Sequence, residues 1–172
     1  MIIIGYQGIG KSSLAKGGNG FIDLESGNFW VNGDRDEHWA QVYANMAVHL
    51  SQQGYNVFTS SHKIVREFLK NHPAVCDSRE KAPELLAVCY PALSLREPWT
   101  QKLKDRYNQT GLLKDFKAWK NAEGMYLENI MDLSSEELPV IHIVLQSMDY
   151  KLEEELAKVS VFKKGAGSIA TQ

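Results

Sequence analysis

The sequence predicts a single α/β domain of three layers, with a mostly parallel sheet of five strands and helices on both of its faces. Short apolar runs alternate along the chain with segments of helical periodicity, which is the pattern of parallel strands joined by crossover helices. The length of 172 residues suits one domain with its own core. We find no internal repeat and no dividing linker, and we therefore expect one domain over residues 1–162 and a disordered Gly/Ser/Ala-rich tail over residues 163–172.

The first elements are a buried strand and a short helix. Ile2–Ile4 is wholly apolar and runs into a glycine-rich loop, which is typical of a buried parallel strand. A helical turn is expected at Ser12–Lys16, and the glycines at 17, 18 and 20 end it. Phe21–Leu24 is predicted to be the second strand, and a loop over Ser26–Asp34 follows it.

Asp36–Gln53 is predicted to be an amphipathic helix, which Gly54 ends. Its apolar residues share one helical face: Trp39, Val42, Tyr43, Met46, Ala47 and Leu50. Asn56–Thr59 is the third predicted strand. The next helix is expected to be capped by Ser61 and to end at Pro73.

The C-terminal half begins with a fourth strand at Leu85–Tyr90, which Pro91 closes. Ser94 and Glu97 have the spacing of a capping box, so we expect the basic segment after them to form a helix. The remaining predicted elements are a long helix from Phe116 to about Leu133, a strand at Pro139–Leu145 and a helix at Tyr150–Val159.

Composition and charge restrict the classes of function. Hydrophobic residues make up 44% of the chain, charged residues 23%, and the net charge is −2, which is ordinary for a globular protein and disfavours a nucleic-acid partner. No apolar run approaches the roughly 18–20 residues that span a bilayer, and we see no signal peptide. We therefore expect a cytoplasmic protein with reduced thiols at Cys76 and Cys89, and no feature specifies an oligomeric state.

A phosphate-binding loop is predicted at residues 5–12, because Gly5-x-x-x-x-Gly10-Lys11-Ser12 fits the Walker A pattern without a mismatch. Glycines let backbone N–H groups turn inward around phosphate oxygens at the start of a helix. Lys11 is expected to reach the β- and γ-phosphates of ATP or GTP, and the Ser12 hydroxyl to bind Mg²⁺. The other expected nucleotide-binding residues are Gly8, Ile9, Gly10 and Ser13. A chance match is disfavoured because the motif follows an apolar strand and precedes helix-forming residues.

An acidic pair, Asp23 and Glu25, closes the second predicted strand. Ligands of open α/β sheets bind at this carboxyl edge. Asp23 is a candidate to bind Mg²⁺ or to orient and deprotonate an acceptor hydroxyl, and Glu25 is a candidate to contact the acceptor. The alternative is an ordinary acidic pair after a strand.

A basic segment runs from Arg96 to Arg106. Arginines near a transferring phosphoryl group stabilise its negative charge. Arg106 is the stronger candidate because it lies beside the buried stripe of the predicted helix, and the alternative for the whole segment is a solvated helix face. Arg35 and Arg66 are candidate ligands of an acceptor phosphate, although both could be plain surface charges.

With these residues in view, the chain resembles the nucleoside monophosphate kinase and shikimate kinase-like branch of P-loop proteins. The resemblance covers the order of elements over nearly the whole chain, and its one sharp motif is Gly5–Ser12. It implies ATP and Mg²⁺ as cofactors, an acidic role for Asp23 after the second strand, and a lid over residues 91–110 that carries Arg96 and Arg106. Stretches around Asp23, Ser60 and Trp119 are also similar to small kinase-like proteins of bacteriophages.

The chain departs from that branch in three ways, the first of which is that the expected helix after the phosphate-binding loop is much shorter than the family's. It has no Asp-Gly-x-Pro-Arg element, and neither Asn56–Thr59 nor Leu85–Tyr90 ends in a Walker B aspartate. The first hypothesis is a kinase that transfers the γ-phosphoryl group of ATP to a (deoxy)nucleoside monophosphate or a similar small acceptor. The second is a kinase of a small alcohol or of a polynucleotide 5′ hydroxyl, and the third is a nucleotide-binding interaction module with little or no turnover.

Overall fold

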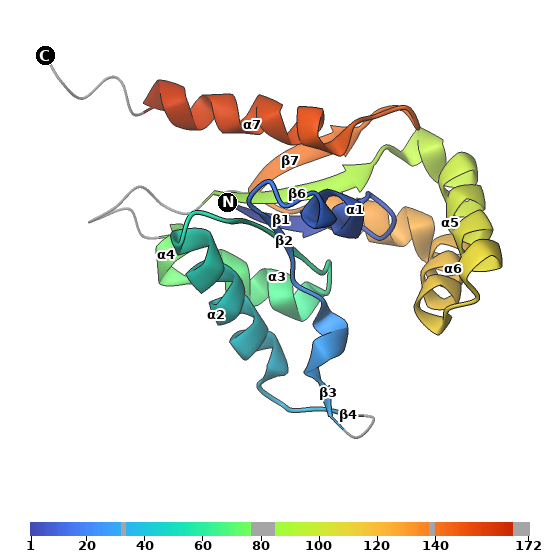
Figure 1. Cartoon of the computed structure of the whole chain (residues 1–172), viewed down its shortest axis with the longest axis horizontal. Coiled ribbons are helices and arrows are strands. Elements are labelled where there is room, and N and C mark those ends of the chain that lie inside the picture. Colours follow the sequence, from blue (N-terminus) through green and yellow to red (C-terminus); the bar gives the residue numbers. More distant parts are fainter. Residues whose placement is uncertain (32–33, 77–84, 138–139, 167–172) are drawn as a thin grey trace, which may run out of the picture.

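The fold is centred on one parallel sheet, seen here in a computed structural model that describes residues 1–31, 34–76, 85–137 and 140–166 (Figure 1). Its strands, all parallel to their neighbours, follow the order β2-β5-β1-β6-β7. They are β1 (Ile2–Gly5), β2 (Phe21–Asp23), β5 (Asn56–Thr59), β6 (Leu86–Pro91) and β7 (Val140–Leu145). The prediction of a parallel five-stranded sheet is confirmed. Pro139, the expected start of the last strand, lies outside the described residues.

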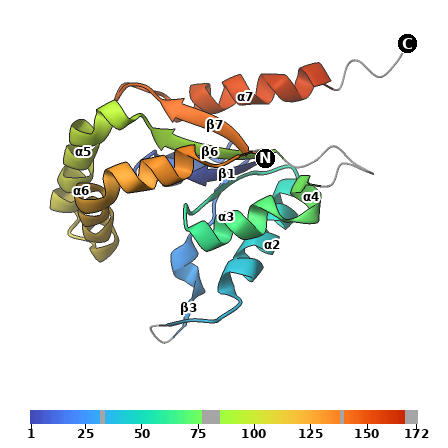
Figure 2. The same ribbon diagram turned by 180° about the vertical axis from the view of Figure 1, so that it is seen from behind.

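Helices cover the sheet on both sides, which gives three layers. In Figures 1 and 2, α7 (Leu152–Ala166) lies on one side, and α2 (Trp39–Gln52), α3 (Lys63–Lys70) and α4 (Pro73–Cys76) lie on the other. Because α7 runs to Ala166, residues 163–166 are helical, and only residues 167–172 of the expected tail lie outside the described chain.

The segment expected to be a loop at Ser26–Asp34 contains short regular elements. A 3₁₀ turn, η1 (Ser26–Phe29), leads into the antiparallel pair β3 (Trp30–Val31) and β4 (Asp34–Arg35). Strands of two residues are too short to produce a period-two pattern, which is why the sequence did not indicate them.

A helical hairpin of α5 (Arg96–Thr110) and α6 (Leu113–Ser134) follows the 3₁₀ turn η2 (Leu93–Leu95), and its loop end projects beyond the sheet (Figures 1 and 2). Gly111, at a φ of 62°, allows the chain to leave α5 and enter α6. The predicted caps are wrong, because the N-cap residues are His62 for α3 and Leu95 for α5, rather than Ser61 and Ser94.

The core includes the helix that was expected to be part of a lid. Strands β1 and β6 are buried along their whole length. Trp99 and Leu103 of α5 are fully buried in the same core. Helix α5 is therefore anchored to the body of the domain, and it needs no closing motion to reach the end of β1. Among the described residues, no helix is long and apolar enough to span a membrane.

Candidate functional site

A cavity of about 380 Å³ opens where the chain leaves β1. Three parts of the chain meet there: the loop after β1, the end of β2, and the facing ends of α5 and α6. The lining residues are Gln7, Gly8, Gly10, Lys11, Ser12, Ser13, Asp23, Glu25, Arg106, Thr110, Leu112, Lys114 and Asp115. The fold thus brings most of the residues that the sequence indicated to one place.

The loop at residues 5–12 has the conformation that its glycines permit. Gly8 and Gly10 adopt φ angles of 86° and 99°, a region that side chains disfavour. A Cβ atom on Gly5 would lie 2.7 Å from a side-chain carbon of Lys11. Gly8 and Gly10 thus permit a loop backbone that other residues would strain, and a side chain at Gly5 would have to displace the side chains of Ile9 and Lys11.

Lys11 and Ser12 start α1 (Lys11–Lys16) at the floor of the cavity. The Lys11 ammonium donates a hydrogen bond to the Gly5 carbonyl at 2.9 Å. Burial lowers the pKa of Lys11, while the carboxylates of Asp23 and Glu25 act in the opposite direction. A partly desolvated cation at this position gains more from a phosphate than a solvated one does.

Asp23 lies against the loop because β2 ends there. The Ser12 hydroxyl donates to Asp23 Oδ2 at 2.5 Å. Behind it, the buried Tyr43 hydroxyl donates to the Leu24 carbonyl at 2.5 Å and accepts from the Ser60 amide at 2.9 Å. Tyr43 thus joins the ends of β2 and β5 and fixes where Asp23 and the neighbouring Glu25 enter the site.

The donor set around Ser12 suits Mg²⁺ held together with a nucleotide. The Ser12 hydroxyl and the Asp23 carboxylate supply two adjacent oxygen ligands, and Mg²⁺ usually completes its shell with water and substrate phosphates. In the part of the chain that the structure describes, no group of three or more His, Cys, Asp and Glu side chains could hold a metal. Binding of a metal here would therefore depend on the phosphates.

Arg106 reaches the cavity from α5. Its Nη2 lies 2.8 Å from Oδ1 of Asp115, a buried carboxylate that also accepts from the Thr110 hydroxyl at 2.6 Å. The Arg106 Nε is buried and has no hydrogen-bond partner among the described residues. Asp115 thus holds the guanidinium at the edge of the cavity, with part of its hydrogen-bonding capacity unused.

Sequence reasoning missed five lining residues: Gln7, Thr110, Leu112, Lys114 and Asp115. Gln7 lies within the motif at residues 5–12, so its place in the sequence is the one signal that could have identified it as a lining residue. Lys114 approaches Glu25, with Nζ and Oε1 3.9 Å apart, so an ion pair bridges α6 and the end of β2. No local pattern shows that Lys114 and Asp115 fold back beside Arg106, because that depends on the turn between α5 and α6.

Arg35 and Arg96 lie outside the cavity. The Arg35 guanidinium is 3.9 Å from the centre of the Trp39 ring, and its Nη2 donates to the Ser26 carbonyl at 3.2 Å. Arg96 is exposed in the first turn of α5. Its position ten residues before Arg106 corresponds to about 15 Å along a helix.

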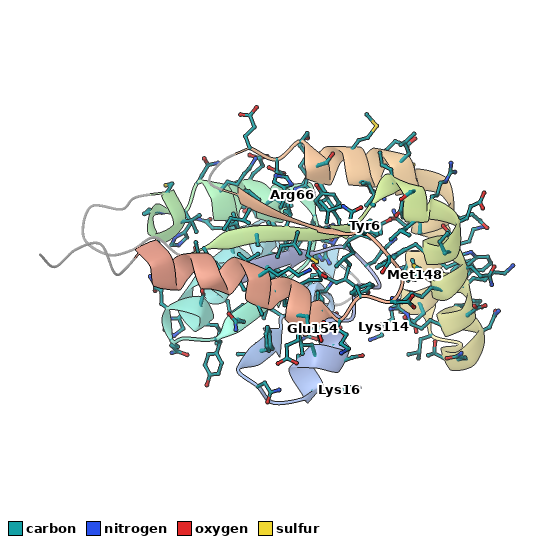
Figure 3. All side chains as sticks on the ribbon, turned by 90° about the horizontal axis from the view of Figure 1, so that it is seen from above. Tyr6, Lys16, Arg66, Lys114, Met148 and Glu154 are labelled. Atoms are coloured by element: carbon teal, nitrogen blue, oxygen red, sulfur yellow. The ribbon has the colours of Figure 1, made fainter. Side chains whose placement is uncertain are left out.

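Arg66 has a structural role, which corrects its interpretation as a substrate ligand. The side chain is buried, and it donates to Glu136 Oε1 and to the Ser61 carbonyl, both at 2.5 Å, and also to Asp132. Lys70 pairs with the same Glu136 at 2.7 Å. In Figure 3, Arg66 lies well away from Lys114, which lines the cavity. The guanidinium thus connects α3 to the end of α6.

Glu136→Gln should lower the free energy of unfolding by about 2 kcal/mol, because it removes the carboxylate that pairs with both the buried Arg66 and Lys70, while Arg66 stays paired with Asp132. Burial raises the pKa of Glu136, but the bonds from Lys70 and Arg66 outweigh it and lower the pKa overall. The stabilisation is therefore present above the ordinary carboxyl range and is lost as the pH falls through the lowered pKa. Urea unfolding at several pH values measures this, with Glu137→Gln at the exposed neighbouring position as the control. Equal stability of the two variants near neutral pH would contradict the role given to Arg66.

The arrangement combines cations and a carboxylate around a loop suited to anions. Lys11, Arg106 and Lys114 supply positive charge to the cavity from three different helices, and Asp23 supplies a carboxylate beside the Ser12 hydroxyl. Such a set can hold a polyphosphate and balance charge that develops on it.

Comparison with protein-family models gives no match, and comparison with curated proteins gives no significant one.

Proposed function

We propose that the protein is an ATP-dependent phosphotransferase of the P-loop fold that passes the γ-phosphoryl group to a (deoxy)nucleoside monophosphate or a similar small acceptor. The observation that carries this proposal is the single cavity that unites Lys11 and its loop with Asp23 and Arg106. A site for a free anion without a metal gains nothing from a carboxylate beside the loop. A transferase needs one, to bind Mg²⁺ or to orient the attacking hydroxyl.

Each residue then has a defined part. The loop from Gly8 to Ser13 holds the donor phosphates with its amides, and Lys11 adds a positive charge. Mg²⁺, when bound, neutralises the phosphate oxygens, and Ser12 and Asp23 are the residues that would hold it. Arg106 stabilises the charge spread over the group in transit.

A second cavity, of about 410 Å³, supports a nucleotide rather than a simple polyphosphate as the donor. It shares Gly10 and Ser13 with the first cavity, so the two adjoin at the loop. Its walls include Leu14, Tyr150 and the stem of Lys102, which suit the flat apolar faces of a base.

The acceptor side is assigned to the mouth of the first cavity. Glu25 and Lys114 lie there, with the Lys114 ammonium 3.9 Å from the Glu25 carboxylate. Because a nucleotide acceptor carries its own phosphate, it needs a cation distinct from those of the donor site. We assign this role to Lys114 in place of Arg66, whose charge is already paired.

One assay separates this proposal from its alternatives. Release of ADP should be measured with Mg²⁺ and ATP across nucleoside monophosphates, small alcohols and 5′-hydroxyl oligonucleotides. Stimulation by a monophosphate supports the proposal, and stimulation by either of the other classes reassigns the acceptor. Nucleotide binding with no transfer to any acceptor supports a regulatory binding module, an alternative favoured because β5 ends at Thr59 and β6 at Pro91, and neither end is an aspartate.

Asp23→Asn should lower Mg²⁺-dependent turnover about a hundredfold while changing ATP affinity little. The amide keeps the shape and an acceptor for the Ser12 hydroxyl, but it removes the charge. Turnover and ATP affinity should be measured across a magnesium titration. Asp105→Asn, at an exposed position of α5 outside the cavity, is the matched control. Equal turnover of wild type and Asp23→Asn at every magnesium concentration would show that Asp23 is an ordinary acidic residue at the end of a strand, with no role in transfer.

A further inference from the structure

We infer that Trp99 is a positioning residue for the phosphate-binding loop, because its indole N–H fixes the orientation of the peptide between Gln7 and Gly8. The inference rests on the proposed function in one respect, namely that the ligand of the loop is a polyphosphate. It assigns a task to α5 other than carrying Arg106.

Trp99 packs on the outer side of the loop. Its side chain is fully buried, and its Nε1 donates to the Gln7 carbonyl at 3.0 Å. Gly8 lies so close that a Cβ atom there would be 3.3 Å from Nε1 and 2.8 Å from a Leu103 methyl group. Helix α5 therefore holds the loop through one hydrogen bond and through a contact that only glycine permits.

The geometry of a trans peptide connects this hydrogen bond to ligand binding. The C=O and N–H groups of one peptide point in opposite directions. With the Gln7 carbonyl directed to Trp99, which lies outside the cavity, the Gly8 N–H is directed to the cavity side. Glycine would otherwise allow this peptide to turn over, and the carbonyl oxygen would then repel a phosphate.

Tyr150 acts on the next peptide in the same way. Its ring stacks on Trp99 with centroids 5.9 Å apart, and its hydroxyl lies 3.4 Å from the Gly8 carbonyl, to which it donates. Lys102 donates to the same hydroxyl at 3.1 Å. Because an ammonium can only donate, the proton of the Tyr150 hydroxyl is left for Gly8. Two consecutive carbonyls of the loop are thus hydrogen-bonded by side chains that lie outside the first cavity.

The test compares two replacements that separate the hydrogen bond from the packing. Trp99→Phe keeps a large ring against Tyr150 and removes the donor, whereas Trp99→His keeps an N–H and loses more apolar surface. Affinities for tripolyphosphate and for MgATP should be measured by calorimetry, and stability by urea unfolding. Trp119→Phe, on α6 and outside the cavity, is the matched control.

We expect Trp99→Phe to bind both ligands at least about tenfold more weakly than wild type. Trp99→His should bind more tightly than Trp99→Phe although it is less stable. If Trp99 acted by packing alone, the two variants would rank in the same order by ligand affinity as by stability. Wild-type affinity in Trp99→Phe, or weaker binding by Trp99→His than by Trp99→Phe, would overturn the inference.

Two further measurements keep the inference testable if the histidine variant does not fold. Tyr150→Phe, which removes only a hydroxyl, should weaken tripolyphosphate binding about threefold. In the ligand-free protein, the amide resonance of Gly8 should move in Trp99→Phe and stay in place in Trp119→Phe. An unchanged Gly8 resonance in Trp99→Phe, or unaltered binding by Tyr150→Phe, would contradict the inference.

The outcomes also separate this inference from the proposed function. If the variants follow the expected order but the wild type transfers phosphate to no acceptor, the role of Trp99 stands and the kinase proposal fails. If transfer is normal and Trp99→Phe binds as wild type does, only the role of Trp99 fails. A wild type that binds neither ATP nor tripolyphosphate would overturn both.

Discussion

Lys11→Ala is expected to lower the rate of phosphoryl transfer by about a thousandfold or more. Its ammonium lies 2.9 Å from the Gly5 carbonyl, in the cavity shared with Asp23 and Arg106. Without it, the β- and γ-phosphates lose a charge that the backbone amides cannot replace. Steady-state turnover and calorimetric ATP affinity measure the effect.

The same lysine predicts a dependence of ATP affinity on pH. Burial lowers the pKa of Lys11, and the charged form is the one that binds phosphate. Affinity in the wild type should therefore be retained below the lowered pKa and should fall as the pH rises through it, at a lower pH than for a free lysine. Lys11→Ala should lack this alkaline decline.

Lys16→Ala is the control for Lys11→Ala, because Lys16 is exposed in the last turn of the same helix. Both variants should unfold close to wild type, since Lys11 makes one hydrogen bond to Gly5 and leaves the core unchanged. Wild-type turnover together with wild-type ATP affinity in Lys11→Ala would show that residues 5–12 are not a phosphate-binding loop.

Much of the fold could be predicted from the sequence, because its signals are local. Ile2–Ile4 and Leu85–Tyr90 are continuous apolar runs, and the structure buries both in the middle of the sheet. The loop at residues 5–12 is equally local, since its glycines, Lys11 and Ser12 are neighbours in the chain. Asp23 could be placed because parallel strands end at one edge, which brings residues that follow different strands together.

What could not be predicted depends on contacts between distant segments. Arg66 was predicted to be a candidate ligand of an acceptor phosphate, but it is paired with Asp132 and Glu136, which lie 66 and 70 residues further along the chain. Trp99 lies within the segment predicted to form a helix, and only the packing of α5 on the loop brings its indole to Gln7. The spacing at Ser94 fitted a cap, but the 3₁₀ turn at Leu93–Leu95 places Leu95 at the start of α5 instead.

Arg106→Ala is expected to lower kcat by about a thousandfold and to change ATP affinity by less than about threefold. The guanidinium already has a partner in Asp115 at 2.8 Å, so a bound donor gains little from it in the ground state. In the transition state, charge spreads over the transferring group, and a cation at the wall of the cavity then contributes most. Arg96→Ala is the matched control, because Arg96 is an exposed arginine of the same helix, outside the cavity.

Loss of Arg106 also removes the charged partner of the buried Asp115 carboxylate, which keeps the hydrogen bond from Thr110, so Arg106→Ala should be less stable than wild type. The double variant Arg106→Ala/Asp115→Asn removes both charges and should recover part of that stability. If Arg106 acts on the transferring group, kcat stays low in the double variant although its fold is restored. If kcat recovers together with stability, Arg106 only supports the fold. The site would then lack a cation on α5 for the transition state, and the nucleotide-binding module would become the better account of this cavity.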